Sequence, residues 1–272
     1  MDFIAQWNGM HATSCRQKQQ LGDSQEKYWA GSANVQQFAQ HQQQELSGRV
    51  KWELASLPFE AGSTVLDIGA GPGTLAVPLA KRGVQVTALE PSAPMLEALE
   101  AYRRAEDAPA VAAIQSTFED AENLGVYDYV LSSFSFMHGD LKAVLEKMNA
   151  AAAKEVHIFW FLTSPAKSRG NEDLWPLIHG EPYAGEPTAD IIFGALHQLG
   201  IRANMTTFGY TSKKGYANLE AACEEYGRRM LATTAEQTEI IRKYVIEHAV
   251  QVPEGFIMPA QHETAHLWWK RI

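Results

Sequence analysis

From Thr64 onward, short apolar runs alternate with amphipathic segments along the chain. This alternation is typical of repeated βα units built around a mainly parallel sheet. The runs are almost continuously apolar, as strands covered on both faces require. The pattern predicts seven strands, at 64–69, 84–89, 111–115, 127–133, 155–162, about 204–210 and 262–271. It also predicts helices after Gly73 and over 93–104, 141–153, 189–199, 219–231 and 235–250.

Residues 1–60 differ in composition from the rest of the chain. They are rich in glutamine, with a run at Gln42–Gln44, and they carry aromatic residues such as Tyr28 and Trp29. Apolar residues spaced three and four apart predict helices in this part rather than a low-complexity tail. We therefore expect a helical leader over 1–60 and a main domain over 61–272.

Two segments interrupt the α/β pattern of the main domain. Prolines and glycines gather at about 164–188, around Trp175 and Tyr183, which predicts an irregular lid. A helical insertion is expected at about 217–250, before the last strand. The aromatic side chains of the lid suit a planar or cationic small molecule, and ordinary packing explains them equally well.

Composition and charge limit the partners of the protein. The formal net charge is −9, from 32 acidic and 23 basic residues, so a polyanion is repelled on average and nucleic acid is not expected. Basic pairs such as Arg103-Arg104 are short and fit solvated faces. No apolar run reaches the ~18 residues that span a bilayer, and the first residues lack a signal-peptide pattern. The two cysteines, Cys15 and Cys223, form no metal-spaced motif and fit a reducing compartment. We expect a cytoplasmic protein without membrane attachment, as a monomer or a homodimer.

A glycine-rich turn follows the first predicted strand. The strand ends in Asp67, and Gly69, Ala70, Gly71 and Gly73 lead into the next helix. Glycine permits the sharp turn and the close approach of a ligand. The spacing differs from GxGxxG, and a carboxylate two residues before the first glycine disfavours a pyrophosphate. It suits S-adenosylmethionine instead, which carries a zwitterionic amino-acid tail and a sulfonium cation.

A second acid, Glu90, follows the predicted strand 84–89, where a carboxylate can accept both hydroxyl groups of a ribose. Three segments resemble motifs one and two of the class I, Rossmann-like S-adenosylmethionine-dependent methyltransferases: Val65–Gly73, Glu90-Pro91-Ser92 and Met95-Leu96. The resemblance covers about residues 60–162.

The resemblance implies a cofactor site whose first two motifs supply Asp67, Gly69, Ala70, Gly71, Glu90, Pro91 and Met95. In the third motif Thr117 stands where the family commonly has the aspartate that binds adenine, and the Phe118 backbone or ring is the alternative contact. The fourth motif places Ser133 beside the transferring methyl group. Tyr28 of the leader is expected to cover the cofactor, with packing as the equal alternative. Met95 fits a core position as well as a ribose neighbour.

We therefore expect a doubly wound, mostly parallel seven-stranded sheet with helices on both faces and an antiparallel C-terminal strand. The expected reaction is in-line methyl transfer to a small molecule, mainly by positioning, with S-adenosylhomocysteine as product. His138 is the candidate general base, and a role as a helix cap is its alternative. Two other functions stay open: a non-catalytic module that binds the cofactor as a regulator, and a nicotinamide-dependent oxidoreductase.

The run His262-Glu263-Thr264-Ala265-His266 matches the HExxH pattern of zinc proteases. That pattern binds metal on a helix, where positions four apart lie within ~6 Å of each other. Here the residues that follow predict a strand, on which the two histidines are roughly 13 Å apart at ~3.3 Å per residue. No metal site is expected.

Overall fold

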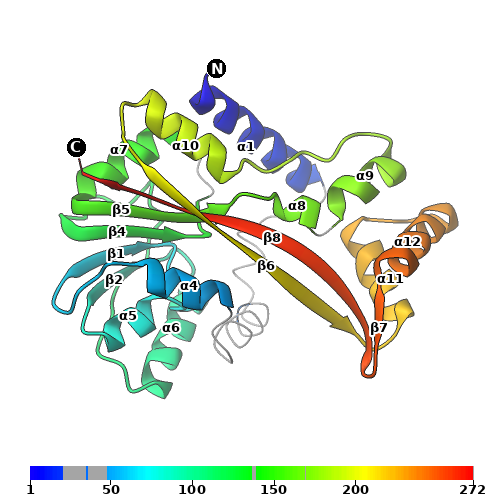
Figure 1. Ribbon diagram of the computed structural model, residues 1–272, viewed down its shortest axis with the longest axis horizontal. Coiled ribbons are helices and arrows are strands. Elements are labelled where there is room, and N and C mark those ends of the chain that lie inside the picture. The colour runs from blue at the N-terminus through cyan, green and yellow to red at the C-terminus, as the bar shows by residue number, and fades with distance from the viewer. Residues whose placement is uncertain (21–34, 36–47, 137–138, 169, 272) are drawn as a thin grey trace.

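The computed structural model describes residues 1–20, 35, 48–136, 139–168 and 170–271 (Figure 1). Its strands are β1 (Thr64–Ile68), β2 (Gln85–Leu89), β3 (Ala112–Ile114), β4 (Tyr127–Ser133), β5 (Ala152–Phe161), β6 (Asn204–Tyr216), β7 (Val250–Val252) and β8 (Gly255–Lys270). Its helices are α1 (Phe3–Gln20), α4 (Gly48–Ser56), α5 (Ala76–Lys81), α6 (Ala93–Ala105), α7 (Leu141–Ala151), α8 (Pro165–Ser168), α9 (Asn171–His179), α10 (Ala189–Gln198), α11 (Leu219–Arg229) and α12 (Ala235–His248).

The strands form one sheet in the order β3-β2-β1-β4-β5-β8-β6, with β7 paired to β8. Strands β1 to β5 are parallel, and β8 runs antiparallel to both β5 and β6. The predicted α/β fold with its antiparallel C-terminal strand is thereby confirmed. Among the described residues the sheet has eight strands rather than seven, because the short β7 adds one at the end of the insertion. None of the described helices is both long and apolar enough to cross a membrane.

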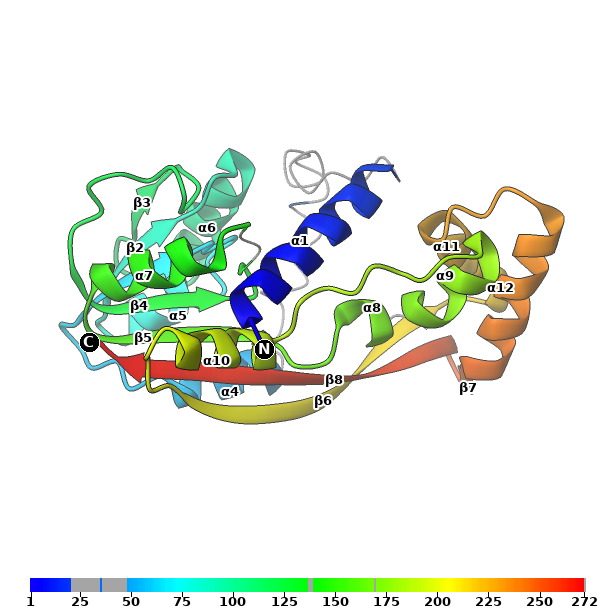
Figure 2. The same cartoon turned by 90° about the horizontal axis from the view of Figure 1, so that it is seen from above.

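Successive residues of the central strands pack on opposite faces of the sheet, as the period of two in a strand requires. Leu66 and Val130 belong to the core beneath α1, α7 and α10, whereas Val65 and Leu131 belong to the core beneath α4, α5 and α6. The helices accordingly form two layers around the sheet (Figure 1, Figure 2). Burial of both strand faces explains why the sequences of these strands are almost continuously apolar.

Helix α1 is attached to the main domain through Trp7, whose side chain is fully buried. The Trp7 ring lies 5.5 Å from the ring of Phe136 and 6.3 Å from that of Trp160, measured between centroids. Burying a large aromatic side chain stabilises such a contact by a few kcal/mol. The start of the leader is therefore part of the folded core.

Strands β6 and β8 are longer than the sequence pattern predicted, since they pair continuously from Asn204↔Trp268 to Tyr216↔Phe256. Pro259 lies inside β8, and proline normally marks an edge or the end of a strand, which explains the underestimate. The outer part of this ribbon extends away from the rest of the sheet toward α9, α11 and α12 (Figure 1). These elements enclose a separate core of Leu174, Trp175, Ile178, Ala222, Tyr226, Met230, Ile241, Val245 and Met258.

This second core bears on whether the aromatic residues of segment 164–188 contact a ligand or belong to ordinary packing. Trp175 is only 2% exposed, and its ring lies 3.9 Å from that of His179 and 5.5 Å from that of Tyr183. None of these three side chains is among those that line the large cavity at the strand ends. For Trp175 the structure supports packing rather than contact with a ligand.

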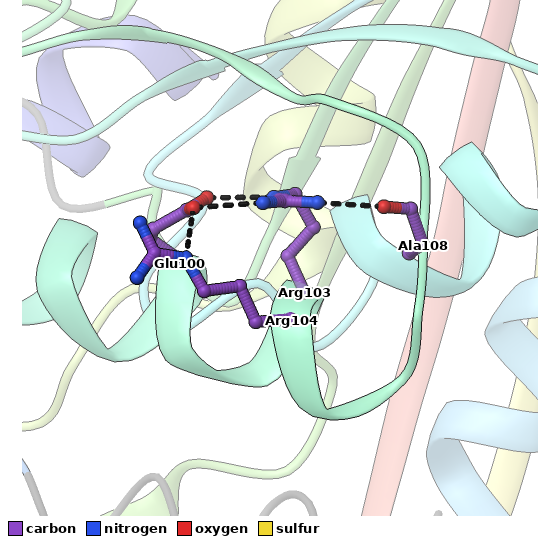
Figure 3. Close-up of polar contacts among 4 residues, drawn as sticks. All are labelled: Glu100, Arg103, Arg104 and Ala108. Atoms are coloured by element: carbon purple, nitrogen blue, oxygen red, sulfur yellow. Dashed lines mark hydrogen bonds and ion pairs between the residues drawn. The ribbon is translucent and has the colours of Figure 1, made fainter.

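The connection from α6 to β3 is held by a cluster of charged side chains (Figure 3). Glu100 accepts hydrogen bonds from Arg103 Nε and Arg104 Nε, both at 2.7 Å, and Arg103 also donates to the carbonyl oxygen of Ala108 at 2.8 Å. The two guanidinium groups lower the pKa of Glu100 to about 2. The basic pair Arg103-Arg104 thus has an internal carboxylate partner.

Candidate functional site

A cavity of about 1020 Å³ lies at the carboxyl ends of β1, β2 and β4. Its wall is formed by the turn after β1, the end of β2 with the start of α6, the turn after β3, the end of β4 and one side of α4. The residues predicted to bind the cofactor come together here: Asp67, Gly69, Ala70, Gly71, Glu90, Pro91, Met95, Thr117, Phe118 and Ser133 all line the cavity. Tyr28 and His138 lie outside the described residues.

The glycine turn after β1 has backbone conformations that only glycine adopts without strain. Gly69 and Gly71 have φ angles of +68° and +53°. A Cβ atom on Gly69 would lie 2.3 Å from the Cβ of Ser135, whereas a Cβ on Gly71 would meet nothing within 4 Å. Gly69 therefore permits close packing against the segment after β4, and the backbone at Gly71 borders open space in the cavity.

The amide groups of this turn already have acceptors inside the protein. Gly69 and Ala70 both donate to the carbonyl oxygen of Leu89, at 2.7 and 3.3 Å, and Gly71 donates to Glu90 Oε2 at 3.0 Å. A turn that binds phosphate instead points its amide groups at the ligand. The arrangement is therefore suited to holding Glu90 in place rather than to cradling a phosphate.

Glu90 is a fixed and mostly buried acceptor at the end of β2. Its carboxylate accepts from the amide of Gly71 through Oε2 and from the amide of Ser92 through Oε1, the latter at 2.9 Å. A carboxylate has about four acceptor positions, so each oxygen has a further one to offer. Burial raises the pKa of Glu90 above its ordinary value.

Asp67 lies at the end of β1 and is only 3% exposed. Burial raises the pKa of its carboxyl group to about 7, and the negative charges of Glu90 and Glu53 act in the same direction. A cation bound in the cavity would favour the ionised form of Asp67 and lower this pKa. The group is therefore poised to change its charge on binding such a ligand.

Helix α4 adds two charged residues to the cavity that the sequence analysis did not identify. Glu53 is fully buried, its Oε2 accepts from Ser133 Oγ at 2.9 Å, and its Oε1 forms an ion pair with Arg49. The Arg49 guanidinium also lies 4.3 Å from the centre of the Phe134 ring. Burial raises the pKa of Glu53, although the Arg49 charge opposes this rise.

A signal for Glu53 was present in the sequence. Val50, Glu53, Leu54 and Leu57 follow the spacing of one helix face, and all four are buried. A carboxylate among the apolar positions of an amphipathic helix has to find a partner when that face packs. The same spacing places Arg49 four residues before Glu53, on the same side of the helix.

The turn after β3 uses the side chain of Thr117 internally. Thr117 Oγ1 donates to Asp120 Oδ2 at 2.7 Å and accepts from the Asp120 amide at 3.1 Å. The ring of Phe118 is 3% exposed and belongs to the core on the α7 side of the sheet. The Thr117 hydroxyl and the Phe118 ring are therefore both engaged within the protein.

The segment after β4 contains a strained residue. Phe134 has a φ angle of +53°, which is unfavourable for a residue with a Cβ by roughly 1–3 kcal/mol. Its amide donates to the carbonyl oxygen of Phe159 at 3.0 Å, and its ring lies 4.6 Å from that of Phe161. Backbone strain of this size is concentrated at functional sites, and here it follows directly after Ser133.

The HExxH run lies within β8, as predicted. His266 Nε2 is 3.0 Å from His157 Nδ1, whereas His262 Nε2 is 2.7 Å from Ser212 Oγ, so the two imidazoles have different partners. In the described ranges, no group of three or more His, Cys, Asp or Glu side chains is arranged to hold a metal ion.

Comparison with known proteins identifies the region around the cavity. Residues 65–155 match the family model of a methyltransferase domain. An uncharacterized protein of Haemophilus influenzae is 33% identical over 177 residues, which are 63% of this chain and 64% of that protein. A ubiquinone biosynthesis O-methyltransferase of Vibrio campbellii is 36% identical over 115 residues, 41% of this chain and 48% of the enzyme. The alignments thus span less than two thirds of either relative.

Two solved structures share the fold at low sequence identity. The YcgJ protein of Bacillus subtilis superposes on this chain with a TM-score of 0.56 at 12% identity. A Bacillus halodurans protein described as a methyltransferase superposes with a TM-score of 0.55 at 14% identity. In each case the match covers 82% of this chain and 97% of the other. The family match supports the resemblance to methyltransferases found in the sequence, and these two likenesses confirm the fold.

Proposed function

We propose that the protein transfers a methyl group from S-adenosylmethionine to a small-molecule acceptor, because residues 65–155 match the family model of a methyltransferase domain. The observation that carries the proposal is one cavity that combines the glycine turn, Asp67 and Glu90. S-adenosylmethionine, when bound, would supply a methyl group on a sulfonium, so that a bond from the acceptor to the methyl carbon forms as the carbon–sulfur bond breaks and S-adenosylhomocysteine leaves.

The residues present fit this cofactor. Glu90 has a further acceptor position on each oxygen for the two ribose hydroxyl groups, and the bonds from Gly71 and Ser92 hold it in place. Asp67 and Glu53 give the cavity a negative potential that favours the sulfonium and the ammonium of the amino-acid tail. Arg49 is the one guanidinium among the described lining residues and suits the carboxylate of that tail.

The same observations weigh against the nicotinamide alternative. A dinucleotide places its pyrophosphate at the glycine turn, where it needs donating amide groups. Here the amides of Gly69, Ala70 and Gly71 are engaged, and the buried carboxylate of Asp67 lines the same cavity. A pyrophosphate at this turn would meet negative charge without the donors that normally stabilise it.

The charges of the cavity support the proposed class of acceptor. Its described lining carries one basic side chain against five acidic ones, namely Glu53, Asp67, Glu90, Glu119 and Asp120. An excess of carboxylates disfavours a polyanionic acceptor and suits a neutral or cationic small molecule. The volume of about 1020 Å³ is at the upper end of the ~300–1,000 Å³ typical of ligand pockets, which leaves room for an acceptor beside the cofactor.

Methyl transfer by this site would depend mainly on positioning. In-line displacement requires the acceptor atom to lie near ~3–3.5 Å from the methyl carbon, with water excluded. Ser133 ends β4 and the strained Phe134 follows it, at the place where the acceptor would meet the methyl group. Should the acceptor arrive protonated, His138, four residues beyond Phe134 in the chain, is the proposed base.

We also propose that the leader (1–60) and the lid (164–188) act together. The helical insertion (217–250) is a further part of the domain 61–272. Gln17 of α1 connects leader and lid, since its Oε1 accepts from the amide of Ala184 at 2.8 Å. Its Nε2 donates to the carbonyl oxygen of Pro182 at 3.5 Å. A joint movement of the two segments would open and close access to the cavity.

The test is formation of S-adenosylhomocysteine. The purified protein is incubated with S-adenosylmethionine and fractions of small metabolites, and the product is measured by mass spectrometry. Turnover that depends on one fraction and disappears in Glu90→Ala would support the proposal. Cofactor binding by calorimetry without turnover on any fraction would favour the regulatory module instead, and no binding at all would refute both.

A further inference from the structure

Lys147 of α7 holds the turn that follows β3. Its Nζ donates hydrogen bonds to three carbonyl oxygens, those of Phe118, Glu119 at 3.1 Å and Ala121 at 2.7 Å. Nζ also lies 4.9 Å from the centre of the Phe118 ring, within range of a cation–π contact. An ammonium group has three N–H donors, so a single turn takes the full donor capacity of Lys147.

The turn itself has the geometry of one helical turn. The Ala121 amide donates to the carbonyl oxygen of Thr117 at 3.0 Å, and the Thr117 hydroxyl binds Asp120. The last carbonyl groups of a helical turn have no partners within it, and a cation placed there is favourable. Lys147 supplies that cation from α7, and thereby fixes the position of the turn relative to the rest of the domain.

The same turn forms one end of the cavity wall. Residues 116–120 line the cavity, and the strand order β3-β2-β1-β4 places them beyond Glu90, on the side opposite Ser133. A ribose held by Glu90 with its methyl-bearing end toward Ser133 directs its base to this turn. The Thr117 hydroxyl is engaged internally, so the backbone of the turn is the part considered for recognition of the base.

We propose that Lys147 is a positioning residue for the adenine base of S-adenosylmethionine. It acts through the turn 117–121, by holding the backbone groups of the turn where they meet the edge of the base, without touching the base itself. This inference rests on the proposed function.

The experiment compares two ligands that differ only in the edge of the base. Affinities for S-adenosylhomocysteine and S-inosylhomocysteine, in which a carbonyl oxygen replaces the adenine amino group, are measured by calorimetry. Lys147→Met removes the ammonium at similar length, and Lys142→Met is the matched control on the same helix, where the side chain is 56% exposed. Lys147→Arg keeps the charge, but its planar fork is poorly shaped to converge on three carbonyl groups.

The wild-type protein is expected to prefer the adenine ligand. Lys147→Met is expected to bind S-adenosylhomocysteine about tenfold more weakly, by analogy with the lower end of the loss seen when the groups that orient metal ligands are removed. The ratio of its affinities for the adenine and the inosine ligand is expected to fall toward one. The affinity and the affinity ratio of Lys147→Arg should lie between those of the wild type and Lys147→Met. Lys142→Met should match the wild type in both.

Three outcomes would overturn the inference. An unchanged preference in Lys147→Met, or an equal loss for both ligands together with a lower melting temperature, would show that Lys147 has a purely structural role. A wild-type protein that binds S-adenosylhomocysteine without preferring it would show that this turn does not read the base. If the wild type fails to bind S-adenosylhomocysteine, the proposed function fails too, which distinguishes that failure from the others.

Discussion

Changing the pH from 8 to 6 is expected to weaken the binding of S-adenosylmethionine about tenfold, because Asp67 loses its charge in this interval. Burial, together with the charges of Glu90 and Glu53, raises the pKa of Asp67 to about 7 in the free protein. The cationic ligand favours the ionised carboxylate. At pH 8 about nine tenths of the Asp67 groups are ionised, and at pH 6 about one tenth, so the apparent affinity falls by about 1.4 kcal/mol.

The assay is calorimetric titration at pH 6, 7 and 8, with Asp67→Asn as the matched variant. Asparagine has similar size and no charge, so the ratio of wild-type to variant affinity removes the titration of the ligand itself. This ratio should rise about tenfold from pH 6 to pH 8. At pH 7, titrations in buffers of different ionisation enthalpy should reveal release of about half a proton on binding.

The same pKa has the opposite effect on the stability of the free protein. The carboxyl group has a pKa of about 7 in the folded protein and an ordinary value of 3.8. The free energy of unfolding therefore falls as the pH rises from about 4 to about 7. Above pH 7 the ionised Asp67 lowers the free energy of unfolding by at most about 4 kcal/mol. Asp67→Asn should therefore be more stable than wild type at pH 8, with a difference that shrinks toward pH 4, while binding the cofactor more weakly. An affinity ratio that stays constant between pH 6 and pH 8 would refute this reasoning.

Three further predictions concern other groups. Glu90→Ala should weaken S-adenosylmethionine binding by about 1.5–3 kcal/mol in a folded protein, whereas Glu97→Ala on the exposed side of α6 should not; equal calorimetric affinities would contradict the assigned role of Glu90. Burial lowers the pKa of His157 to about 3 and that of His266 to about 4, so the stability that these neutral groups contribute is lost as the pH falls below 6.5. By pH 5 each contributes a loss of about 2 kcal/mol, and His157→Phe should reduce the difference between urea unfolding at pH 7.5 and pH 5 by that amount; an unchanged difference would argue against it. Elemental analysis should find no stoichiometric zinc, and one tightly held zinc lost in His262→Ala would contradict the reading of the HExxH run.

Local patterns predicted most of the main domain. The strand 127–133 was predicted with the bounds that β4 has, and the helices at 93–104 and 189–199 differ from α6 and α10 by one residue at one end. The glycine turn and Glu90 were recognised because their spacing along the chain is a direct consequence of one βα unit following another. These predictions depend on hydrophobic period and turn chemistry, which a short stretch of sequence contains.

The contribution of α4 to the cavity could not be predicted in the same way. Glu53 and Ser133 are 80 residues apart in the sequence, and their 2.9 Å hydrogen bond depends on how α4 packs against the sheet. Buried polar groups of this kind break the local pattern, and a sequence shows them only as misplaced charges on an apolar face. The extension of β6 and β8 was missed for a related reason, since pairing between the strands overrides the proline inside β8.

The sequence by itself determined the α/β class, the succession of strands and helices, and the chemical groups of the first two motifs. Each of these follows from residues close together in the chain, whose period and φ requirements act before any long-range contact forms. Only the tertiary structure decided that Glu53 joins Asp67 and Glu90 in one cavity, and that burial there, together with the two neighbouring negative charges, raises the pKa of Asp67 to about 7. It also decided that Lys147 holds the turn after β3, because a charge interaction is set by distance in space, which the order of residues along the chain does not contain.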